Sequence, residues 1–170
     1  KVDLLWKKVG FGKAKTDTNA QKKAPNEATG SDLIIKANQI WTQSASIPGT
    51  MPTSNSSIVH VYIDSVSGAH KTTEDATATD NRTWKTNITN WIPPGFGATY
   101  QLKVYAAPDG QANPQTNGTQ LFETGSGNDD QWYFDYQSGI LNFIGSNLPS
   151  AIGTGTSNVI YVAGAKYVGT

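Results

Sequence analysis

The sequence contains no cysteine, which excludes both a disulfide framework and a thiolate metal site. Charge is sparse and balanced: 13 basic and 13 acidic residues give a net charge of zero, which argues against nucleic acid as the main partner. No run approaches the ~20 apolar residues that are needed to span a bilayer. We therefore expect a partner that is neither nucleic acid nor membrane.

Large aliphatic residues are also scarce, whereas Thr, Asn, Ser and Gly are abundant and aromatic residues make up 10% of the chain. This composition is typical of all-β proteins outside the cell or on the surface of a virion. A chain of 170 residues fits one domain and is long enough to bury roughly 70% of its unfolded surface. Because the sequence does not begin with methionine, we expect it to be processed or to start within a longer polypeptide.

The most distinctive stretch is residues 131–145, QWYFDYQSGILNFIG. Two runs of aromatic and aliphatic residues flank a polar break that ends in Gly139, a residue type that adopts positive φ without steric cost. Two β-prone runs separated by a glycine-containing turn predict a β-hairpin. Bulky apolar side chains alternate onto both faces of this hairpin, so we expect it to be an inner hairpin covered on two sides.

Further strands are predicted along the chain from alternating apolar residues bounded by turn formers. No amphipathic helix is indicated, and the pattern predicts an all-β fold, either a β-sandwich or a jelly-roll-like body. Residues 91–97, with two prolines and two glycines, predict a rigid connector, and Gly164 a bulge or bend. The predicted strands are two short ones within residues 32–47, then 57–64, an edge strand within 82–88, 99–107, 119–123 and 158–168.

Residues 1–31 differ from the rest of the chain. A small apolar cluster opens this segment, and a polar, lysine-containing tract that cannot form a core follows it. We expect an extended N-terminal arm ahead of a sandwich domain over residues 32–170, with the arm anchored in a pocket of a neighbouring subunit. The residues expected at this subunit interface are Leu4, Leu5, Trp6 and Phe11.

Reaction chemistry finds little support in the sequence. His60 and His70 are the only histidines, and no nucleophile elbow of the GxSxG type is present. The Gly-rich, acidic residues 125–130 could supply calcium ligands, but the spacing is not that of an EF-hand, and turn formation is the ordinary role of such residues. The acids Asp64, Glu123 and Asp135 show no pairing suited to glycoside hydrolysis. We therefore expect no enzyme activity, no catalytic residue, no metal site and no cofactor.

Three tryptophans stand in polar surroundings, which indicates that their side chains are accessible at the surface. Exposed tryptophans can stack on sugar rings, although packing under loops or between subunits is the more common use. The candidate ligand-binding residues are Trp41, Trp84 and Trp91, with a host-surface glycan as the partner.

Several segments of this chain resemble virion structural proteins of tailed phages that infect marine bacteria, notably cyanobacteria. The resemblance covers most of the chain, and DYQSGILNF within the hairpin is its most distinctive part. It implies a particle component of the tail, fibre or head-appendage type, located in the virion, and it brings no catalytic residues. The segments are VDLLWKKVGFGKAKTDTNAQKKAPNE, TDNRTWKTNITNWIPPGFGATYQLKVY, GSGNDDQWYFDYQSGILNFIG and VIYVAGAKYVG.

The leading hypothesis is thus a non-enzymatic virion protein, a tail fibre or appendage component, that assembles by packing of its subunits. Its partners would be other virion proteins and further copies of itself, with a homotrimer as one suitable closed arrangement. One alternative is a carbohydrate-binding, receptor-recognition module of a fibre. Another is a capsid decoration or neck protein.

Overall fold

A computed structural model describes residues 41–123, 131–145, 147–153 and 155–170. Contacts divide the chain into two units, Lys1–Ile40 and Trp41–Thr170, and all of the described residues belong to the second unit. The expected arm, the domain boundary after residue 31 and the first of the two short strands expected within 32–47 therefore lie outside the described residues.

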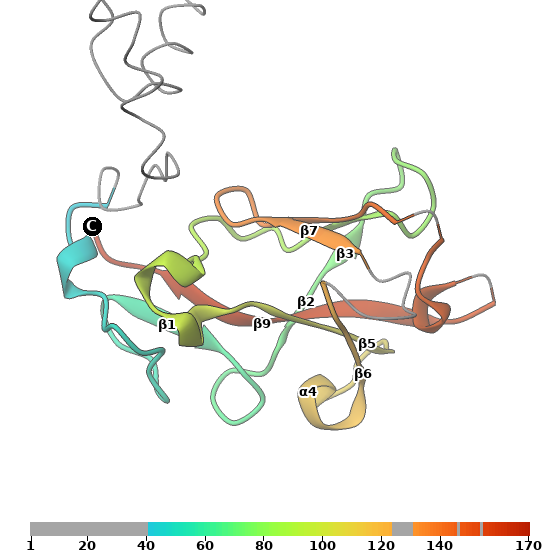
Figure 1. The fold of residues 1–170 in the computed structure, drawn as a ribbon. Coiled ribbons are helices and arrows are strands. Elements are labelled where there is room, and N and C mark those ends of the chain that lie inside the picture. Colours follow the sequence, from blue (N-terminus) through green and yellow to red (C-terminus); the bar gives the residue numbers. More distant parts are fainter. Residues whose placement is uncertain (1–40, 124–130, 146, 154) are drawn as a thin grey trace, which may run out of the picture. The chain divides into compact units, whose positions relative to one another are not determined.

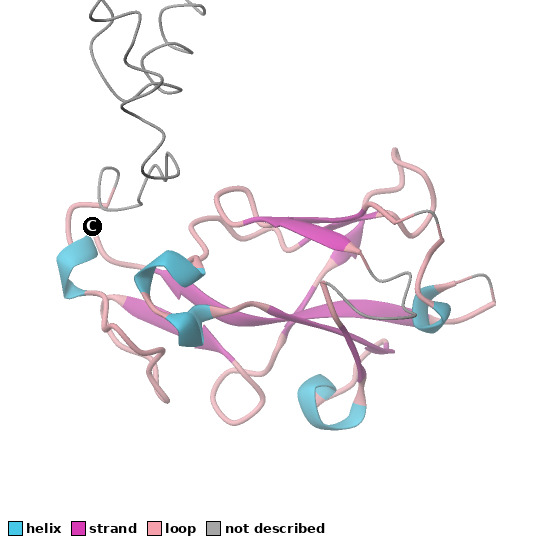
Figure 2. Ribbon diagram, viewed as in Figure 1, coloured by secondary structure: helices cyan, strands magenta, loops and turns pink. Residues whose placement is uncertain are grey.

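The described residues form two antiparallel sheets with very little helix, which confirms the predicted all-β fold (Figures 1 and 2). In Figure 1 the sheets lie one above the other, as layers of a sandwich. The lower sheet has the order β1 (Val59–Tyr62), β9 (Asn158–Tyr167), β5 (Lys103–Pro108), β6 (Thr119–Leu121), and β2 (His70–Lys71) also pairs with β9. The upper sheet has the order β3 (Thr73–Glu74), β4 (Thr83–Lys85), β8 (Ile140–Phe143), β7 (Trp132–Asp135).

Short helical turns connect these strands. Two of them, η3 (Pro94–Phe96) and η4 (Ala98–Tyr100), follow one another directly because Pro93 and Pro94 fix φ before the glycine-rich turn. The others are η2 (Ser44–Ser46), α4 (Pro114–Asn117) and η5 (Ser150–Ile152).

The core lies between the two sheets. Strands β5 and β9 contribute small and branched side chains to it, and β4, β7 and β8 contribute large aromatic ones, so that the two inner faces interdigitate. Alternation along each strand produces this arrangement, since every second residue of β5 and β9 points inward. The buried members are Trp84, Trp91, Leu102, Val104, Ala106, Leu121, Trp132, Phe134, Leu141, Phe143, Ile152, Ile160 and Val162.

Strand β9 organises the lower sheet. On one side it pairs with β5 over six residues, and on the other side with β1 and then β2. Tyr62 pairs with Gly164 and His70 pairs with Val162, so residues 63–69 leave the sheet and return opposite a single residue of β9. The chain from β1 to β2 is therefore one strand interrupted by a seven-residue excursion.

Thr72 carries the chain from the lower sheet to the upper one. Its backbone N–H and its hydroxyl both donate to the Ile160 carbonyl, at 2.9 and 2.8 Å, and the next residues form β3. Thr72 is buried, with 1% of its surface exposed. Its two hydrogen bonds satisfy the polar groups that this crossing brings into the core.

A second connection between the sheets is formed by residues 90–92. The Trp91 N–H donates to the carbonyl of Tyr136, in the turn of the β7–β8 hairpin, at 2.8 Å, and the Ile92 N–H donates to the Ala165 carbonyl of β9 at 2.8 Å. The rigid connector predicted for residues 91–97 thus begins as a bridge between the two layers.

The last residues of the chain close against the first described ones. The Gln43 N–H donates to the Thr170 carbonyl at 3.2 Å, and the Thr170 N–H donates to Oε1 of Gln43 at 3.0 Å. The Tyr167 hydroxyl also donates to the Thr170 carbonyl, at 2.8 Å, and accepts from the Gln43 N–H. Both ends of the unit Trp41–Thr170 therefore lie side by side.

The predicted hairpin is confirmed, but its coverage on two sides is wrong. Strands β7 and β8 pair from Trp132 with Phe143 to Asp135 with Ile140. Only the face with Trp132 and Phe134 enters the core, whereas Tyr133 and Ile144 on the other face are 58% and 67% exposed. No described element covers that second face, because the lower sheet packs on the inner face alone.

Other predictions about strands need correction. The strand around Trp84 is confirmed, but it lies between β3 and β8 and is not an edge. The second short strand expected within 32–47, at residues 39–41, lies mostly outside the described residues and stays a prediction, while residues 44–46 form a helical turn. The register of β9 continues through Gly164 without a bulge: a Cβ atom there would meet the Trp91 ring at 3.4 Å, so the glycine allows that ring to pack closely.

Candidate assembly surface

The outer face of the β7–β8 hairpin carries two of the large apolar side chains that the described residues expose, Tyr133 and Ile144. Tyr133 pairs with Asn142 across the hairpin, which places Ile140 and Ile144 at the diagonal positions of the same face. Tyr133 and Ile144 are strongly exposed, and Ile140 is half-buried. We call Tyr133, Ile140 and Ile144 the hairpin strip. Clustered exposed apolar side chains of this kind are typical of contact surfaces.

The free edge of β7 borders the hairpin strip. The Ile144 N–H donates to the Gln131 carbonyl at 2.7 Å, so Gln131 and every second residue after it exchange hydrogen bonds with β8. By this alternation, the backbone groups of Trp132 and Phe134 point away from β8, toward the side on which no described strand pairs. An open row of donors and acceptors can receive an extended segment of another chain.

The rest of this sheet face is polar and already satisfied. The Thr83 hydroxyl donates to the Asn142 side chain at 3.0 Å, and Lys85 forms an ion pair of 2.7 Å with Asp75. The hydrogen bond from Lys85 and the bonds from Thr77 lower the pKa of Asp75 to about 2. The apolar surface is thereby confined to the β7–β8 end of the sheet.

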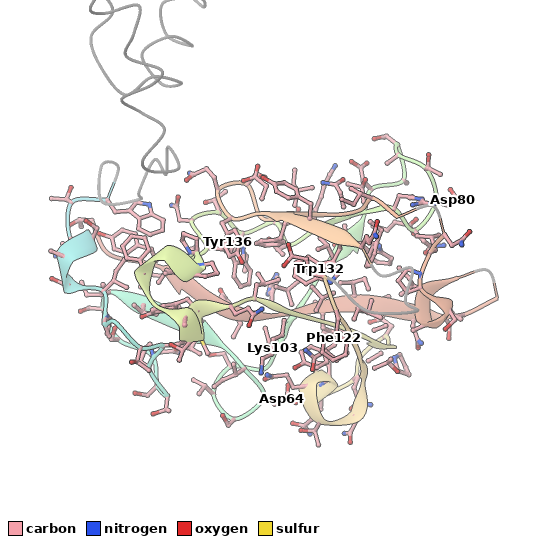
Figure 3. The ribbon with its side chains drawn as sticks, viewed as in Figure 1. Asp64, Asp80, Lys103, Phe122, Trp132 and Tyr136 are labelled. Atoms are coloured by element: carbon pink, nitrogen blue, oxygen red, sulfur yellow. The ribbon has the colours of Figure 1, made fainter. Side chains whose placement is uncertain are left out.

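Aromatic side chains on the inner face of the hairpin fix it to the lower sheet. Trp132 Nε1–H donates to the Leu121 carbonyl of β6 at 3.1 Å. Burial raises the pKa of Tyr136 to about 12, and a hydrogen bond to the Leu102 backbone lowers that pKa by a smaller amount. In Figure 3, Trp132 lies between the two layers. Because these contacts already hold the hairpin in place, the hairpin strip would lose little conformational entropy on binding a neighbour.

A cavity of about 130 Å³ lies beside Trp132, between the edges of the two sheets. Leu102, Leu121 and Trp132 line it together with the more polar residues Lys103 and Glu123 and with Phe122. Its volume corresponds to a single side chain and not to a small-molecule site of several hundred Å³.

The residues predicted to form the subunit interface, Leu4, Leu5, Trp6 and Phe11, lie outside the described residues. The surface identified above was missed by the sequence analysis as a contact site. Alternation places Tyr133 and Trp132 on opposite faces of the hairpin, but no local pattern indicates that one of these faces remains uncovered.

The three tryptophans predicted to be accessible are buried: Trp41 is 6% exposed, Trp84 3% and Trp91 1%. That expectation of exposure is wrong. Trp41 stacks against Tyr167 with ring centres 4.4 Å apart. Trp84 and Trp91 pack in the core and donate their indole N–H groups locally, to the Asn81 carbonyl and to Thr86 Oγ1. Their polar sequence neighbours belong to turns, while the rings point inward, so no ring face is open for a sugar.

The structure brings the two histidines together on either side of Tyr62. Ring centres are 4.6 Å apart for His60 and Tyr62, and 5.2 Å apart for Tyr62 and His70. His70 Nε2 lies 2.7 Å from the Thr86 carbonyl, an arrangement in which Nε2 carries the hydrogen and donates it. Burial lowers the pKa of His70, and the nearby Lys166 charge acts in the same direction.

The acidic side chains of the described residues are dispersed in structural roles. Asp135 accepts hydrogen bonds from the backbone N–H of Gln137 and from the Ser138 hydroxyl, at 2.9 and 2.7 Å, which is the turn role that its position predicts. Asp64 accepts from the Thr116 N–H at 3.0 Å. Within the described ranges, no three His, Asp or Glu side chains are grouped so that they could hold a metal ion. Residues 125–130 lie outside those ranges.

No helix among the described residues is long and apolar enough to cross a membrane. Comparisons of the chain with protein-family models, with curated proteins and with solved structures gave no match.

Proposed function

We propose that this protein is a structural component of a phage virion whose sandwich domain assembles through the hairpin strip and the free edge of β7. The observation that carries the proposal is the exposure of Tyr133 and Ile144 on a hairpin whose other face is fixed in the core. The resemblance of the same hairpin to tail, fibre or head-appendage proteins supports a place in the particle. A capsid decoration or neck protein would use the same surface in the same way.

The chemistry of the surface favours a second copy of the chain as the neighbour. The hairpin strip carries no charge, the polar groups beside it are paired, and the chain has no net charge, so nothing selects a strongly charged partner. Two such edges can pair antiparallel across a two-fold axis, and a closed ring can form if the edge receives an extended segment of the next subunit. In both arrangements, exposed apolar surface is removed from water.

The oligomeric state of the full chain tests this proposal. The double variant Tyr133→Lys/Ile144→Lys should form smaller species than the parent protein in light scattering coupled to size-exclusion chromatography, because lysines at these positions cannot be buried in pairs. Val168→Lys is the matched control, since Val168 is 41% exposed and lies outside the hairpin strip. Changes at exposed positions should alter folding stability by no more than about 0.5 kcal/mol.

Two outcomes would contradict the proposal: a monomeric parent protein, or an unchanged mass of the double variant. Deletion of residues 1–12 provides the second test, because an arm that anchors on a neighbour should also be required for assembly. Electron cryo-microscopy of the intact particle would then locate the subunit.

A further inference from the structure

A polar groove opens at the opposite edge of the upper sheet, beside β3. It has a volume of about 330 Å³, within the range of small-ligand sites. One wall is the chain that crosses from β2 to β3, and the other comes from the residues that lead into β9. The side chains that matter below are Lys71, Glu74, Asn81, Trp84, Ser157 and Asn158.

Glu74 faces into this groove and is held in place. It pairs with Trp84 in the sheet, and paired residues of antiparallel strands point to the same side, so the carboxylate lies on the inner face of the edge strand. One carboxylate oxygen accepts the Asn81 N–H. Asn81 has φ of +60° and accepts the Trp84 indole N–H on its carbonyl at 2.9 Å. The carboxylate is therefore positioned by two successive hydrogen bonds.

Other side chains of the groove also have polar atoms that can bind a ligand, in some cases beside an atom that is already hydrogen-bonded within the protein. Asn158 Nδ2 donates to the Ala151 carbonyl at 2.9 Å, which leaves the acceptor Oδ1 of the same amide. A carboxylate has two oxygens, so Glu74 likewise retains an acceptor. The exposed Ser157 hydroxyl can both donate and accept.

The charges and hydrogen-bonding atoms that line the groove limit the class of ligand that it can bind. An anion such as phosphate needs clustered cations, but Lys71, the cation of this groove, already forms an ion pair of 2.6 Å with Asp109. A divalent cation needs several carboxylate oxygens, and Glu74 is the acid that lines the groove. An apolar peptide would cover Glu74 and leave its charge unpaired. A neutral saccharide has hydroxyls that donate to these acceptors and C–H faces that can rest on the apolar part of the wall.

We propose that this groove binds a neutral saccharide through the Glu74 carboxylate, the Asn158 amide and the Ser157 hydroxyl. This mode of binding uses hydrogen bonds and not the stacking of a sugar on a tryptophan ring that the sequence suggested. Trp84 is only 3% exposed, and its indole N–H instead positions Asn81 by a hydrogen bond to the Asn81 carbonyl. Recognition by positioned polar groups makes the site selective for the hydroxyl pattern of the sugar. The site does not depend on assembly through the hairpin strip.

Saturation-transfer NMR and titration calorimetry on the full chain would test this site, with glucose, galactose, N-acetylglucosamine, maltose and lactose as probes. At least one of them should bind saturably at millimolar concentration. Glu74→Gln keeps an acceptor for the Asn81 N–H but loses the charge, and should weaken binding about tenfold. Ser157→Phe should abolish binding by filling the groove.

Glu123→Gln is the matched control, because Glu123 lies outside the groove and its change should leave binding intact. Thermal unfolding monitored by circular dichroism should be the same for all variants. The proposal is overturned if none of the five sugars binds, if binding survives Ser157→Phe, or if inorganic phosphate binds in their place.

Discussion

At the scale of single residues, glycines with similar backbone angles have very different surroundings. Gly139 ends the hairpin turn with φ of +72°, and a Cβ atom there would meet the Ile88 carbonyl and Thr86 Oγ1 at 2.0 and 2.2 Å. Gly110 has φ of +79°, but nothing lies within 4 Å of its Cβ position. The first glycine is needed for its conformation and for space, the second for its conformation alone.

Replacing Gly139 by alanine should therefore cost much more than the same change at Gly110. We expect Gly110→Ala to lower the free energy of unfolding by about 1 kcal/mol, the usual cost of a left-handed alanine. Gly139→Ala adds overpacking against the Thr86 network and should lower it by about 2–4 kcal/mol in total. Urea denaturation measures both; equal losses would show that the turn relaxes without strain.

Acid should destabilise the protein through His70. Because burial lowers the pKa of His70 from the ordinary value of 6.5, the folded state takes up fewer protons than the unfolded state below that pH. The free energy of unfolding should therefore decrease as pH falls below 6.5, and this contribution should level off below the pKa of the folded state. A protonated imidazole would also face the Lys166 charge.

Denaturation curves at several pH values would measure this dependence. His70→Gln, whose amide can still donate to the Thr86 carbonyl, should flatten the curve between pH 6.5 and the folded-state pKa. His60→Gln, on the other side of Tyr62, is the control. A curve that is equally steep in His70→Gln would assign the effect to other groups.

At the scale of elements, β9 differs from every other strand that the structure describes. It is ten residues long and pairs with three other strands, β5 on one side and β1 and β2 on the other, and residues 160–165 are all buried. By contrast, the excursion at 63–69 belongs to no strand and is mostly half-exposed. Local stability should follow this difference, since opening β9 would require breaking the lower sheet.

Hydrogen exchange followed by mass spectrometry should show the slowest amides in peptides from β9 and β5 and the fastest in peptides covering residues 63–69. Backbone pairing and burial both protect β9, whereas the excursion has few strand partners. Exchange in β9 as fast as in the excursion would contradict the central role of this strand.

The elements with regular alternation were predictable. Residues 57–64, 99–107 and 158–168 and the hairpin all show period-two apolar patterns, and each contains a strand at or near the predicted place. Strands β2 and β3 have two residues each and lie in a polar, Thr-rich stretch, so no local pattern indicates them. Pairing with β9 and β4 specifies them instead.

The candidate sites were less predictable than the fold. Burial of Trp84 and Trp91 depends on strands that are distant in sequence, and their immediate neighbours are polar. The exposure of Tyr133 depends on the order of strands in the sheet, which no local pattern encodes. The groove beside Glu74 is formed where residues 71–74 meet residues 156–159, segments more than 80 positions apart.

At the scale of the whole molecule, contacts separate Trp41–Thr170 as a compact unit, and the buried hydrophobic residues that the structure describes within it extend from Trp41 to Tyr167. A chain consisting of residues 41–170 should therefore fold without the first unit. Circular dichroism should show a β spectrum and one cooperative thermal transition, close to that of the full chain. Loss of the cooperative transition would show that residues 1–40 contribute to the core.

The meeting of Gln43 with Thr170 has a consequence for engineering. Because the two ends of the unit Trp41–Thr170 are hydrogen-bonded to each other, a short glycine linker could join them in a chain of these residues, and new termini could be opened within the excursion at 63–69. Such a circular permutant would keep both sheets and the order of strands within them. The same geometry would let the domain be inserted into an exposed loop of an unrelated host protein, with its two attachment points close enough together to leave the host fold undisturbed.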